Sequence, residues 1–591
     1  MKKSISNGEI VRILREIGEY LEMRGVPFKP RAYEKAAETV ETLREEAADI
    51  YGKGGLKALE DIPGVGLSIA EKMEELIKTG RLKYYEELKK KTPVNLAELT
   101  KVEGLGPMKI RRLYEKLKIK NLAGLEKAAR AGKIAGLAGF GEKSEENILK
   151  GIEFLKKSGG RFVLGFAAPL IKTIEERLRA VGGVKTVEVA GSARRRKETI
   201  GDADFLVIAA NPKRVMDCFV SMPEVARVLA RGGTKSMIQL ENGLEADVRV
   251  LPEKSYGAAL NYFTGSKDHN VKLRELAMRK GWKLNEYGLF QVAELRGKKR
   301  GTAQKDKMIA GKNEAEIYET LGLAYIEPEL REDAGEIEAA LAGRLPKLIG
   351  YGDLKGDLQV QTDWSDGENS IEEMALEARR LGLEYIAVTD HTKRLAMARG
   401  LDEKRIIAQM KKIDAINAGF EKKGIKFRVL KGTECDILKD GRLDLPDEIL
   451  KKLDVVGAAV HSYFNLPKKE QTDRLIRAMK NPHVDVVFHP TGRLINRRPA
   501  YELDMEAIVK AARETKTVLE IDAFCDRLDL KDVHIRMCVE AGVPLAVDSD
   551  AHNLSHFAML EYGIAQARRG WAAKSDVINA WPLSKMLAWL K

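Results

Sequence analysis

The stretch from residue 189 to residue 209 reads VAGSARRRKETIGDADFLVIA, and its second half is a short apolar strand that opens with two aspartates. Side chains alternate along a strand, so Asp202 and Asp204 point to the same face. Two carboxylates so close repel each other unless cations lie between them, which is typical of a magnesium site. An Asp-x-Asp pair alone is more often a solvated turn. Asp247, central in a second apolar strand (LEADVRVLP), adds a third carboxylate and favours the metal site.

The residues just before the two aspartates favour a phosphate ligand. Gly191 and Ser192 form a Gly-Ser pair, and the basic cluster Arg194 to Arg196 follows it closely. Guanidinium groups bind phosphate oxygens through paired N–H donors. The stretch therefore predicts a site for a metal-bound polyphosphate.

The chain around this stretch changes in character twice. Residues 1–155 have apolar residues at helical spacing between short glycine-containing turns, and residues 160–333 mix strands with helices in an α+β pattern. After a boundary near residue 340, seven short apolar strands alternate with amphipathic segments. Repeated β–α units predict a parallel sheet, and seven of them suggest a closed barrel whose chemistry lies after the carboxyl ends of the strands.

Composition bounds the class of protein and its compartment. A chain of 591 residues is too long for one core, so we expect two to four domains. The four cysteines are widely scattered, which predicts reduced thiols in a cytoplasmic protein, and no apolar run is long enough to span a bilayer. The net charge of +13 favours a polyanionic partner.

Two segments of the helical region, IPGVGLSIAEKM and VEGLGPMKIRRL, share a Gly-x-Gly turn between helices. Gly64 and Gly66 form the first turn, and Gly104 and Gly106 form the second. Such turns leave backbone N–H groups unpaired at a helix N-terminus, where they suit a phosphate oxygen. One copy would equally fit an ordinary helix connection, but two copies in a basic chain predict contacts to a nucleic-acid backbone without base recognition.

Acidic residues and histidines end the strands of the predicted barrel. An isolated histidine is usually structural, but four of the eight histidines end four different strands here, and carboxylates accompany them. Imidazole and carboxylate ligands that converge on one rim suit zinc, manganese or iron. The predicted ligands are Asp366, His391, Glu434, His461, His489, Asp550 and His552. The first strand, GDLQVQTD, offers only the neutral amides of Gln359 and Gln361.

The motifs of the first half resemble those of the family X DNA polymerases, the group that contains DNA polymerase beta, as far as about residue 333. The resemblance implies that Asp202, Asp204 and Asp247 hold two divalent metals, Mg²⁺ or Mn²⁺, for in-line nucleotidyl transfer. The dNTP-binding residues that it implies are Gly191, Ser192, Arg195, Gly201, Tyr262, Phe263, Gly265 and Asn270. Lys267 and Glu245 depart from the polymerase beta pattern, near the base contact and the primer end respectively.

The first hairpin implies a second activity. Lys72 matches the lyase nucleophile of the family, which forms a Schiff base with an abasic sugar, and Lys35 matches a basic, DNA-binding position. A lysine can act this way only if burial or nearby positive charge lowers its pKa. Ser68 replaces a supporting lysine of the family, so an ordinary surface lysine at position 72 is the alternative.

Residues 345–591 resemble the PHP (polymerase and histidinol phosphatase) domain, which often follows the polymerase core in bacterial and archaeal family X polymerases. The resemblance implies a trinuclear cluster that activates water for attack on phosphorus. The three implied sites are Asp366, His391 and His552; Glu434, His461 and His489; and Glu434 and Asp550 with a His-x-His pair. Gln359 and Gln361 stand at the His-x-His positions. We therefore expect two firmly bound Zn²⁺ or Mn²⁺ ions and a weak or empty third site.

The predicted fold is multidomain, with a helical helix-hairpin-helix region, an α+β nucleotidyltransferase palm and thumb, and a C-terminal distorted (β/α)7 barrel. The expected segments are a lyase-like domain 1–90, a fingers-like domain 91–155, a palm 156–260, a thumb 261–333, a linker 334–350 and a PHP domain 351–591.

The expected function is the filling of short DNA gaps in base excision repair, with a 3′–5′ exonuclease or a related 3′-end or abasic-site phosphoesterase in the barrel. The expected partners are gapped or primer–template DNA and dNTPs, without a membrane, and we expect a monomer. One alternative makes the barrel mainly structural or DNA-binding, because its first metal site is degraded. Another is a non-enzymatic scaffold that binds DNA through the hairpins, and the intact aspartate triad argues against it.

Overall fold

In the computed structural model the chain forms two compact units. The first comprises Met1–Gly160 with Asn496–Pro499, and the second comprises Arg161–Ile495 with Ala500–Lys591. The described residues are 5–590 except 6, 42, 44, 63, 101, 103–104, 158–159 and 293–306. The predicted lyase-like and fingers-like segments share the first unit, whereas the predicted palm, thumb and barrel share the second.

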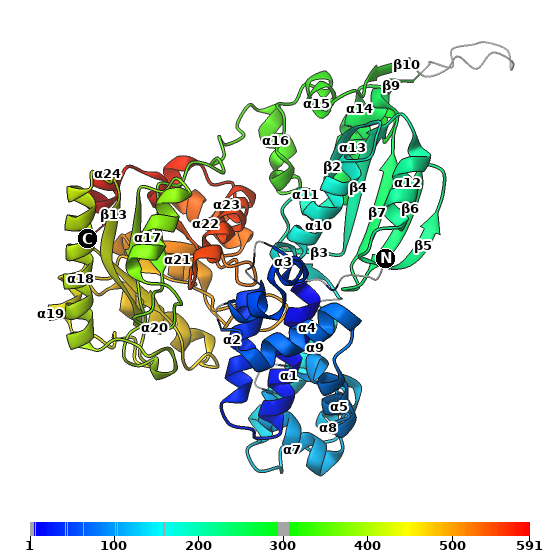
Figure 1. The fold of residues 1–591 in the computed structure, drawn as a ribbon. Helices are drawn as coiled ribbons and strands as arrows, with labels where there is room; N and C mark the ends of the chain where they lie inside the picture. The colour runs from blue at the N-terminus through cyan, green and yellow to red at the C-terminus, as the bar shows by residue number, and fades with distance from the viewer. Residues whose placement is uncertain are drawn as a thin grey trace, which may run out of the picture. The chain divides into compact units, whose positions relative to one another are not determined.

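The first unit is built from helices (Figure 1). They are α1 (Asn7–Met23), α2 (Lys29–Glu41), α3 (Ala47–Glu60), α4 (Leu67–Thr79), α5 (Lys83–Lys91), α6 (Leu96–Leu99), α7 (Pro107–Leu117), α8 (Leu122–Arg130) and α9 (Glu142–Lys157). Ile10, Leu14 and Ile17 recur at helical spacing on α1 and are fully buried in the core of the unit. Gly66 and Gly106, both extended, directly precede α4 and α7, so the two glycine turns lead into helix N-termini.

The second unit begins with a mixed sheet in the order β2-β4-β7-β6-β5. Its strands are β2 (Val184–Val189), β4 (Asp202–Ala209), β5 (Val225–Arg231), β6 (Lys235–Leu240) and β7 (Glu245–Val250). Strands β4 and β7 pair in parallel and the other pairs are antiparallel. The neighbouring elements are β1 (Phe162–Val163), α10 (Leu164–Arg179), α11 (Gly191–Arg194), β3 (Thr199–Ile200) and α12 (Pro212–Val220). Ala203, Phe205 and Val207 of β4 form one core with α10 and α12.

A small antiparallel sheet and helices follow this mixed sheet. The elements are η1 (Glu253–Ser255), α13 (Tyr256–Thr264), α14 (Lys267–Arg279), β8 (Trp282–Asn285), β9 (Gly288–Gln291), β10 (Lys307–Ala310), α15 (Glu314–Leu321), η2 (Pro328–Leu330) and α16 (Glu336–Leu341). The stretch predicted as a linker therefore contains a helix. It is packed in place, because Glu336 Oε1 lies 2.6 Å from Nδ1 of the buried His269.

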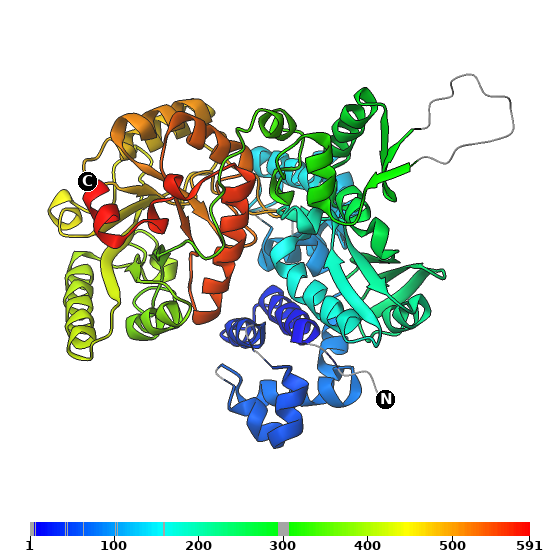
Figure 2. The same cartoon turned by 90° about the horizontal axis from the view of Figure 1, so that it is seen from above.

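The C-terminal part is the predicted seven-stranded parallel barrel, and Figure 2 shows helices around its strands. The strands, in sheet order, are β11 (Gly356–Val360), β12 (Tyr385–Val388), β13 (Arg428–Asp436), β14 (Val455–Ala459), β15 (Val486–Val487), β16 (Val518–Asp522) and β17 (Leu545–Asp548). A parallel bridge between Val360 and Ala551 joins the first and last edges. The barrel is therefore nearly closed.

Both faces of the barrel strands are buried, which explains their continuous apolar sequence. Tyr385 and Ala387 pack in the barrel interior, whereas Ile386 and Val388 pack in the core shared with the helices. The helical elements are α17 (Ile371–Arg380), η3 (Ala396–Ala398), α18 (Glu403–Lys422), α19 (Asp447–Leu450), α20 (Lys468–Met479), α21 (Met505–Thr515), α22 (Asp532–Ala541), η4 (Leu554–Met559), α23 (Leu560–Arg569), η5 (Lys574–Asp576), η6 (Ile578–Ala580) and α24 (Leu583–Trp589). Among the described residues, none of the helices combines the length and the apolar character that crossing a bilayer requires.

Candidate active sites

The three predicted palm carboxylates lie together on two neighbouring strands. Asp204 on β4 is directly opposite Asp247 on β7, and Asp202 lies two residues before Asp204 on the same strand. Burial, and after it the charges of Asp202 and Asp247, together raise the pKa of Asp204 to about 6. The nearest cations are on Lys235 and Arg249, 3.3 and 3.4 Å from Asp247 Oδ2. A divalent cation fits these donors, because its charge relieves their mutual repulsion.

The turn before β4 approaches this carboxylate site closely. Gly191 has a φ of 64°, and a Cβ built on it would lie 2.8 Å from Asp204 Oδ2. A side chain at this position would therefore meet both backbone strain and a carboxylate oxygen. The glycine lets the start of α11, with Ser192, come close to Asp204.

The basic residues after this turn are bound to carboxylates of later elements. Arg194 bonds both oxygens of Glu314 at 3.0 and 2.6 Å, and Arg196 forms an ion pair with Glu561 at 2.7 Å. Arg195 Nε donates to Glu332 Oε1 at 2.9 Å, and its Nη1 donates to the carbonyl of Thr264. Of the predicted cluster, Arg194 and Arg196 thus tie the palm to α15 and α23.

The predicted nucleotide pocket is carried by α13 and the start of α14. The rings of Tyr262 and Phe263 are edge to face with centroids 5.2 Å apart, and the Arg249 guanidinium lies 4.4 Å from the Phe263 centroid. Asn270 Nδ2 donates to the Tyr262 carbonyl at 2.7 Å. Gly265 ends α13 with a φ of 67°. Because Arg249 contacts both Asp247 and Phe263, the pocket and the carboxylate site are contiguous.

Three further positions lie in or next to this part of the palm and thumb. Gly201 is exposed directly before Asp202, and Lys267 is exposed at the first position of α14. Glu245 is exposed and directly opposite Asp202 in the β4–β7 register. The residue that departs from the polymerase beta pattern thus adds a fourth carboxylate beside the triad.

The barrel brings its predicted histidines and acids together at the strand ends. Glu434 is fully buried among imidazoles, with Oε1 3.1 Å from His461 Nε2 and 2.7 Å from His489 Nε2, and Oε2 3.3 Å from His391 Nδ1. Two groups of side chains have ligand atoms that all lie within 4.8 Å of one another inside the group. The first group is Asp366, His391 and His552, and the second is His391, Glu434 and His461. The first group is the set predicted from sequence.

The imidazoles set the charge state of this cluster. Burial alone would raise the pKa of Glu434, but the neighbouring His391, His461 and His489 hold it well below its usual value. Burial lowers the pKa of His461, yet Asp436 and Glu434 raise it to about 9. Asp436 was not predicted; its Oδ1 lies 3.2 Å from His461 Nδ1 and orients the ring. The sequence could have indicated Asp436, because it lies two residues after Glu434 on β13 and therefore on the same face of the strand.

The two glutamines of the first barrel strand are fully buried. Gln361 Nε2 donates to Glu434 Oε2 at 2.8 Å. Among the described residues, Gln359 finds no hydrogen-bond partner for either amide atom and Gln361 finds none for its oxygen. Gln361 therefore reaches the cluster as a neutral hydrogen-bond donor.

Further carboxylates line the barrel beside these glutamines and were missed by the sequence reasoning. Burial and mutual repulsion raise the pKa values of Glu520, Asp522 and Asp548 well above their usual range. Arg527 Nε lies 3.3 Å from Asp522 and 3.6 Å from the predicted ligand Asp550. These carboxylates could have been found in the sequence from the acidic residues that end β16 (LEID) and β17 (AVDSD).

The predicted DNA-binding hairpin of the first unit places two lysines near one turn. Gly64 has a φ of 79°, and a Cβ there would lie 3.0 Å from Lys35 Cγ. Lys72 Nζ donates to the Ser68 carbonyl at 2.7 Å and to Ser68 Oγ at 2.9 Å. Burial lowers the pKa of Lys72, and the charge of Lys29 lowers it further. Gly104 of the second hairpin lies outside the described residues.

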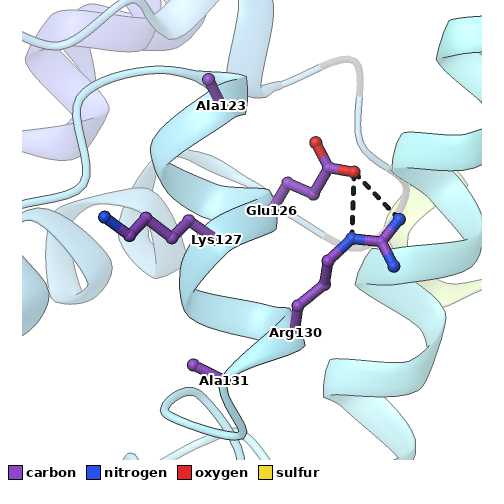
Figure 3. Close-up of a pocket in the computed structure, with 5 residues that line it drawn as sticks. All are labelled: Ala123, Glu126, Lys127, Arg130 and Ala131. Carbon is purple, nitrogen blue, oxygen red and sulfur yellow. Dashed lines mark hydrogen bonds and ion pairs between the residues drawn. The ribbon is translucent and has the colours of Figure 1, made fainter.

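A hollow of about 480 Å³ lies elsewhere in the first unit, along α8 (Figure 3). It is lined by Ala123, Glu126, Lys127, Arg130 and Ala131. Glu126 and Arg130 form an ion pair at 3.0 Å one helical turn apart, while Lys127 projects away from them. None of the predicted site residues lines it.

Comparison with known families assigns the class of the protein. Residues 5–82 match the helix-hairpin-helix domain, residues 96–153 the SAM-like helix-hairpin-helix tandem, residues 259–332 the DNA polymerase beta thumb and residues 357–531 the PHP domain. A polymerase beta thumb followed by a PHP barrel defines a family X DNA polymerase with a PHP domain.

Whole-chain similarity leads to the same family. The chain is 38% identical over 586 residues to the DNA polymerase/3′-5′ exonuclease PolX of Bacillus subtilis, which covers 99% of both proteins. It therefore belongs to the PHP-containing family X DNA polymerases. Over part of its length the chain is similar to a probable phosphatase of Caldicellulosiruptor bescii, 34% identical over 194 residues, 31% of this chain and 73% of that protein. A probable phosphatase of Thermoanaerobacter sp. is 30% identical over 233 residues, 38% of this chain and 88% of that protein.

Proposed function

We propose that the chain fills short gaps in DNA during repair, using the palm carboxylates for two-metal nucleotidyl transfer. The observation that carries this proposal is the pairing of Asp204 with Asp247 on adjacent parallel strands, with Asp202 beside them. Two divalent cations, when bound, lower the pKa of the primer 3′-hydroxyl and neutralise the triphosphate. The carboxylates hold and space those charges, and their mutual repulsion makes the site avid for cations.

The surrounding side chains orient the incoming dNTP. Arg195 is directed by Glu332 and Thr264, and in this proposal its remaining N–H groups bind the triphosphate. Tyr262 and Phe263 pack against the sugar and exclude a 2′-hydroxyl. The glycine turns around Gly66 and Gly106 hold the DNA backbone, so the partners are gapped or primer–template DNA and dNTPs, bound by a monomer.

Extension of a gapped primer with Mg²⁺ tests this function. Asp247→Asn keeps the shape of the side chain and removes its charge, so incorporation should be lost. Asp217→Asn is the matched control, because Asp217 is an exposed palm aspartate paired with Arg231 on the surface. Activity in Asp247→Asn equal to that of wild type, or no Mg²⁺-dependent incorporation by wild type, would overturn the assignment.

We further propose that the barrel hydrolyses phosphodiesters at DNA 3′ ends, as a 3′–5′ exonuclease or a related 3′-end or abasic-site phosphoesterase. The relative from Bacillus subtilis is named for that activity. The supporting geometry is the buried Glu434 among three imidazoles, a donor set that fits Zn²⁺ or Mn²⁺. Such an ion, when bound, activates water for attack on phosphorus. The role of Glu434 is to gather the imidazoles, and Asp436 fixes the ring of His461.

The hydrogen bond from Gln361 to Glu434 favours a second candidate, a barrel that mainly supports the polymerase or holds DNA. Release of the 3′ nucleotide in Mn²⁺ decides between the two. His489→Ala should abolish release, whereas His483→Ala, which changes a histidine outside the cluster, should not. Equal rates in wild type and His489→Ala would remove the barrel from the chemistry.

A lyase activity of Lys72 is supported by its lowered pKa, which leaves more free amine at neutral pH. Borohydride trapping on DNA with a 5′-deoxyribose phosphate tests it. Lys72→Ala should lose the trapped adduct. Lys78→Ala is the control on the same helix, since Lys78 is paired with Glu74 at 2.8 Å. Equal trapping in wild type and Lys72→Ala would assign the adduct to another amine.

A further inference from the structure

Glu332 lies between an arginine of the palm and an arginine of the barrel. Its Oε1 accepts from Arg195 Nε at 2.9 Å and from Arg569 Nη1 at 3.1 Å. Arg195 follows the glycine turn beside the carboxylate triad, and Arg569 is the last residue of α23. The side chain of Arg569 is 3% exposed and that of Arg195 is 13% exposed, so the three groups form a mostly buried bridge.

Arg569 also contacts Arg195 without an intermediary. Its Nη1 donates to the backbone carbonyl of Arg195 at 2.9 Å, while its Nη2 donates to Asp532 Oδ2 at 2.5 Å. Asp532 begins α22, so the barrel holds the guanidinium of Arg569 from its own side. Arg569 therefore restrains both the main chain of Arg195 and Glu332, the residue to which the Arg195 side chain donates.

Glu332 remains ionised in this arrangement. Burial alone would raise its pKa, but the charges of Arg569, Arg195 and Lys197 keep the pKa below its usual value. Arg569 shares one carboxylate oxygen with Arg195, so the barrel supplies part of the charge that neutralises Glu332. A carboxylate left without Arg569 would draw the Arg195 guanidinium toward itself.

The rest of the Arg195 guanidinium is oriented for a ligand. Nε is occupied by Glu332 and Nη1 by the Thr264 carbonyl at the end of α13. Among the described residues, Nη2 has no hydrogen-bond partner. Two fixed nitrogens on a planar group determine the direction of the third.

We propose that Arg569 of the PHP barrel is a positioning residue for the polymerase site, which presents Arg195 to the triphosphate of the incoming dNTP through Glu332 and the Arg195 carbonyl. This inference rests on the proposed role of Arg195. A preorganised guanidinium binds without first losing side-chain freedom, so Arg569 contributes to nucleotide affinity and leaves the metal-dependent step unchanged. The coupling is reciprocal: dNTP binding strengthens the attachment of α23 to Glu332 and the palm.

Single-nucleotide gap filling at varied dNTP concentration tests the proposal, with kcat and KM resolved. For Arg569→Ala we expect KM for dNTP to rise about five- to twentyfold, in the lower part of the usual range for coupled sites, with kcat within about twofold. Arg569→Lys, which keeps the charge, should recover part of the affinity.

The neighbouring Arg568 supplies a matched control. It lies one residue earlier in α23 and contacts Glu329 at 2.7 Å and the Ile349 carbonyl at 2.9 Å, and among the described residues it makes no hydrogen bond with Arg195. Arg568→Ala should therefore keep the wild-type KM. Equal increases in KM for Arg568→Ala and Arg569→Ala would indicate a general loosening of the interface and overturn the proposal.

Arg195→Ala separates this proposal from the function on which it rests. If Arg195→Ala raises KM but Arg569→Ala does not, the positioning role is wrong and the triphosphate site stands. If Arg195→Ala leaves KM unchanged, the triphosphate assignment fails and the positioning role fails with it. Should Arg569→Ala not fold, Arg569→Gln, which keeps an N–H donor without the charge, is judged by the same criteria.

Discussion

The palm carboxylates and the barrel cluster can both hold cations, but different forces keep their ligands in place. In the palm, Asp202, Asp204 and Asp247 are set by the strand register of β4 and β7, and they repel one another. In the barrel, Glu434 attracts the imidazoles that surround it. The palm arrangement is therefore set by the backbone, with Lys235 and Arg249 beside Asp247, whereas the barrel arrangement is held partly by its own ligands.

This difference has a functional meaning. In the palm, Lys235 and Arg249 neutralise the three carboxylates only in part, which would favour a hard oxygen-binding cation such as Mg²⁺. A buried site rich in imidazole retains a transition metal through many reaction cycles. We therefore expect exchangeable ions in the palm and resident ions in the barrel.

The largest effect should come from Asp204→Asn. The substitution removes a central carboxylate while its strand and the barrel stay intact, so polymerase activity should fall by at least about 10²- to 10³-fold, as for loss of one group that stabilises a transition state. Nuclease activity of the same preparation should be unchanged. The two rates are measured on one gapped and one 3′-ended substrate, and a parallel loss of both would show that the sites are not independent.

Glu434→Gln should produce the reciprocal phenotype. Its neutral amide can no longer balance His391, His461 and His489, so the imidazoles separate and nuclease activity should fall by about 10²-fold. Metal content, determined by mass spectrometry after dialysis, should fall with it, and gap filling should persist. Full nuclease activity in Glu434→Gln would show that the carboxylate does not organise the cluster.

The substitution Gln361→His tests the barrel cluster by adding an imidazole instead of removing a ligand. Wild type should retain about two ions per chain, and the variant should approach three, because an imidazole replaces an amide donor beside Glu434. Gln471→His, on α20, is the control for a buried glutamine outside the cluster. Three tight ions in wild type would contradict the expectation of a degraded site.

The smallest effect concerns pH and the stability of the palm sheet. The pKa of Asp204 is raised to about 6 by burial and by its acidic neighbours. Because the pKa of Asp204 is higher in the folded than in the unfolded chain, protonated Asp204 stabilises the fold at pH values below its unfolded-state pKa. This contribution is lost as the pH rises through about 6. The test is amide hydrogen exchange of β4 in the presence of a chelator, with rates corrected for the intrinsic pH dependence of exchange. The free energy of opening should be lower at pH 8 than at pH 5. Asp204→Asn should reduce this pH dependence, and Mg²⁺ should oppose the loss at pH 8.

Several structural features were predictable because their signals are local. The two-residue period of β4 aligns Asp202 with Asp204, and the alternation of strand and helix after residue 340 implies a barrel that gathers strand ends. Asp366, His391 and His552 were expected as one set, and their ligand atoms lie within 4.8 Å of one another. In the other group of the structure, His391 lies with Glu434 and His461 where His489 was expected. Asp436 was missed because an acid two residues after a ligand resembles an ordinary polar strand end.

The sequence by itself determined the fold class, and it indicated the three palm carboxylates and the acids, histidines and glutamines that end the barrel strands. Only the tertiary structure decided which carboxylate pairs with each of the three consecutive arginines. Arg194 and Arg196 are bound by Glu314 and Glu561, and Arg195 is held through Glu332 by Arg569, more than 370 positions further along the chain. Such pairings depend on which charges folding brings within hydrogen-bonding distance, and no spacing within one segment encodes that.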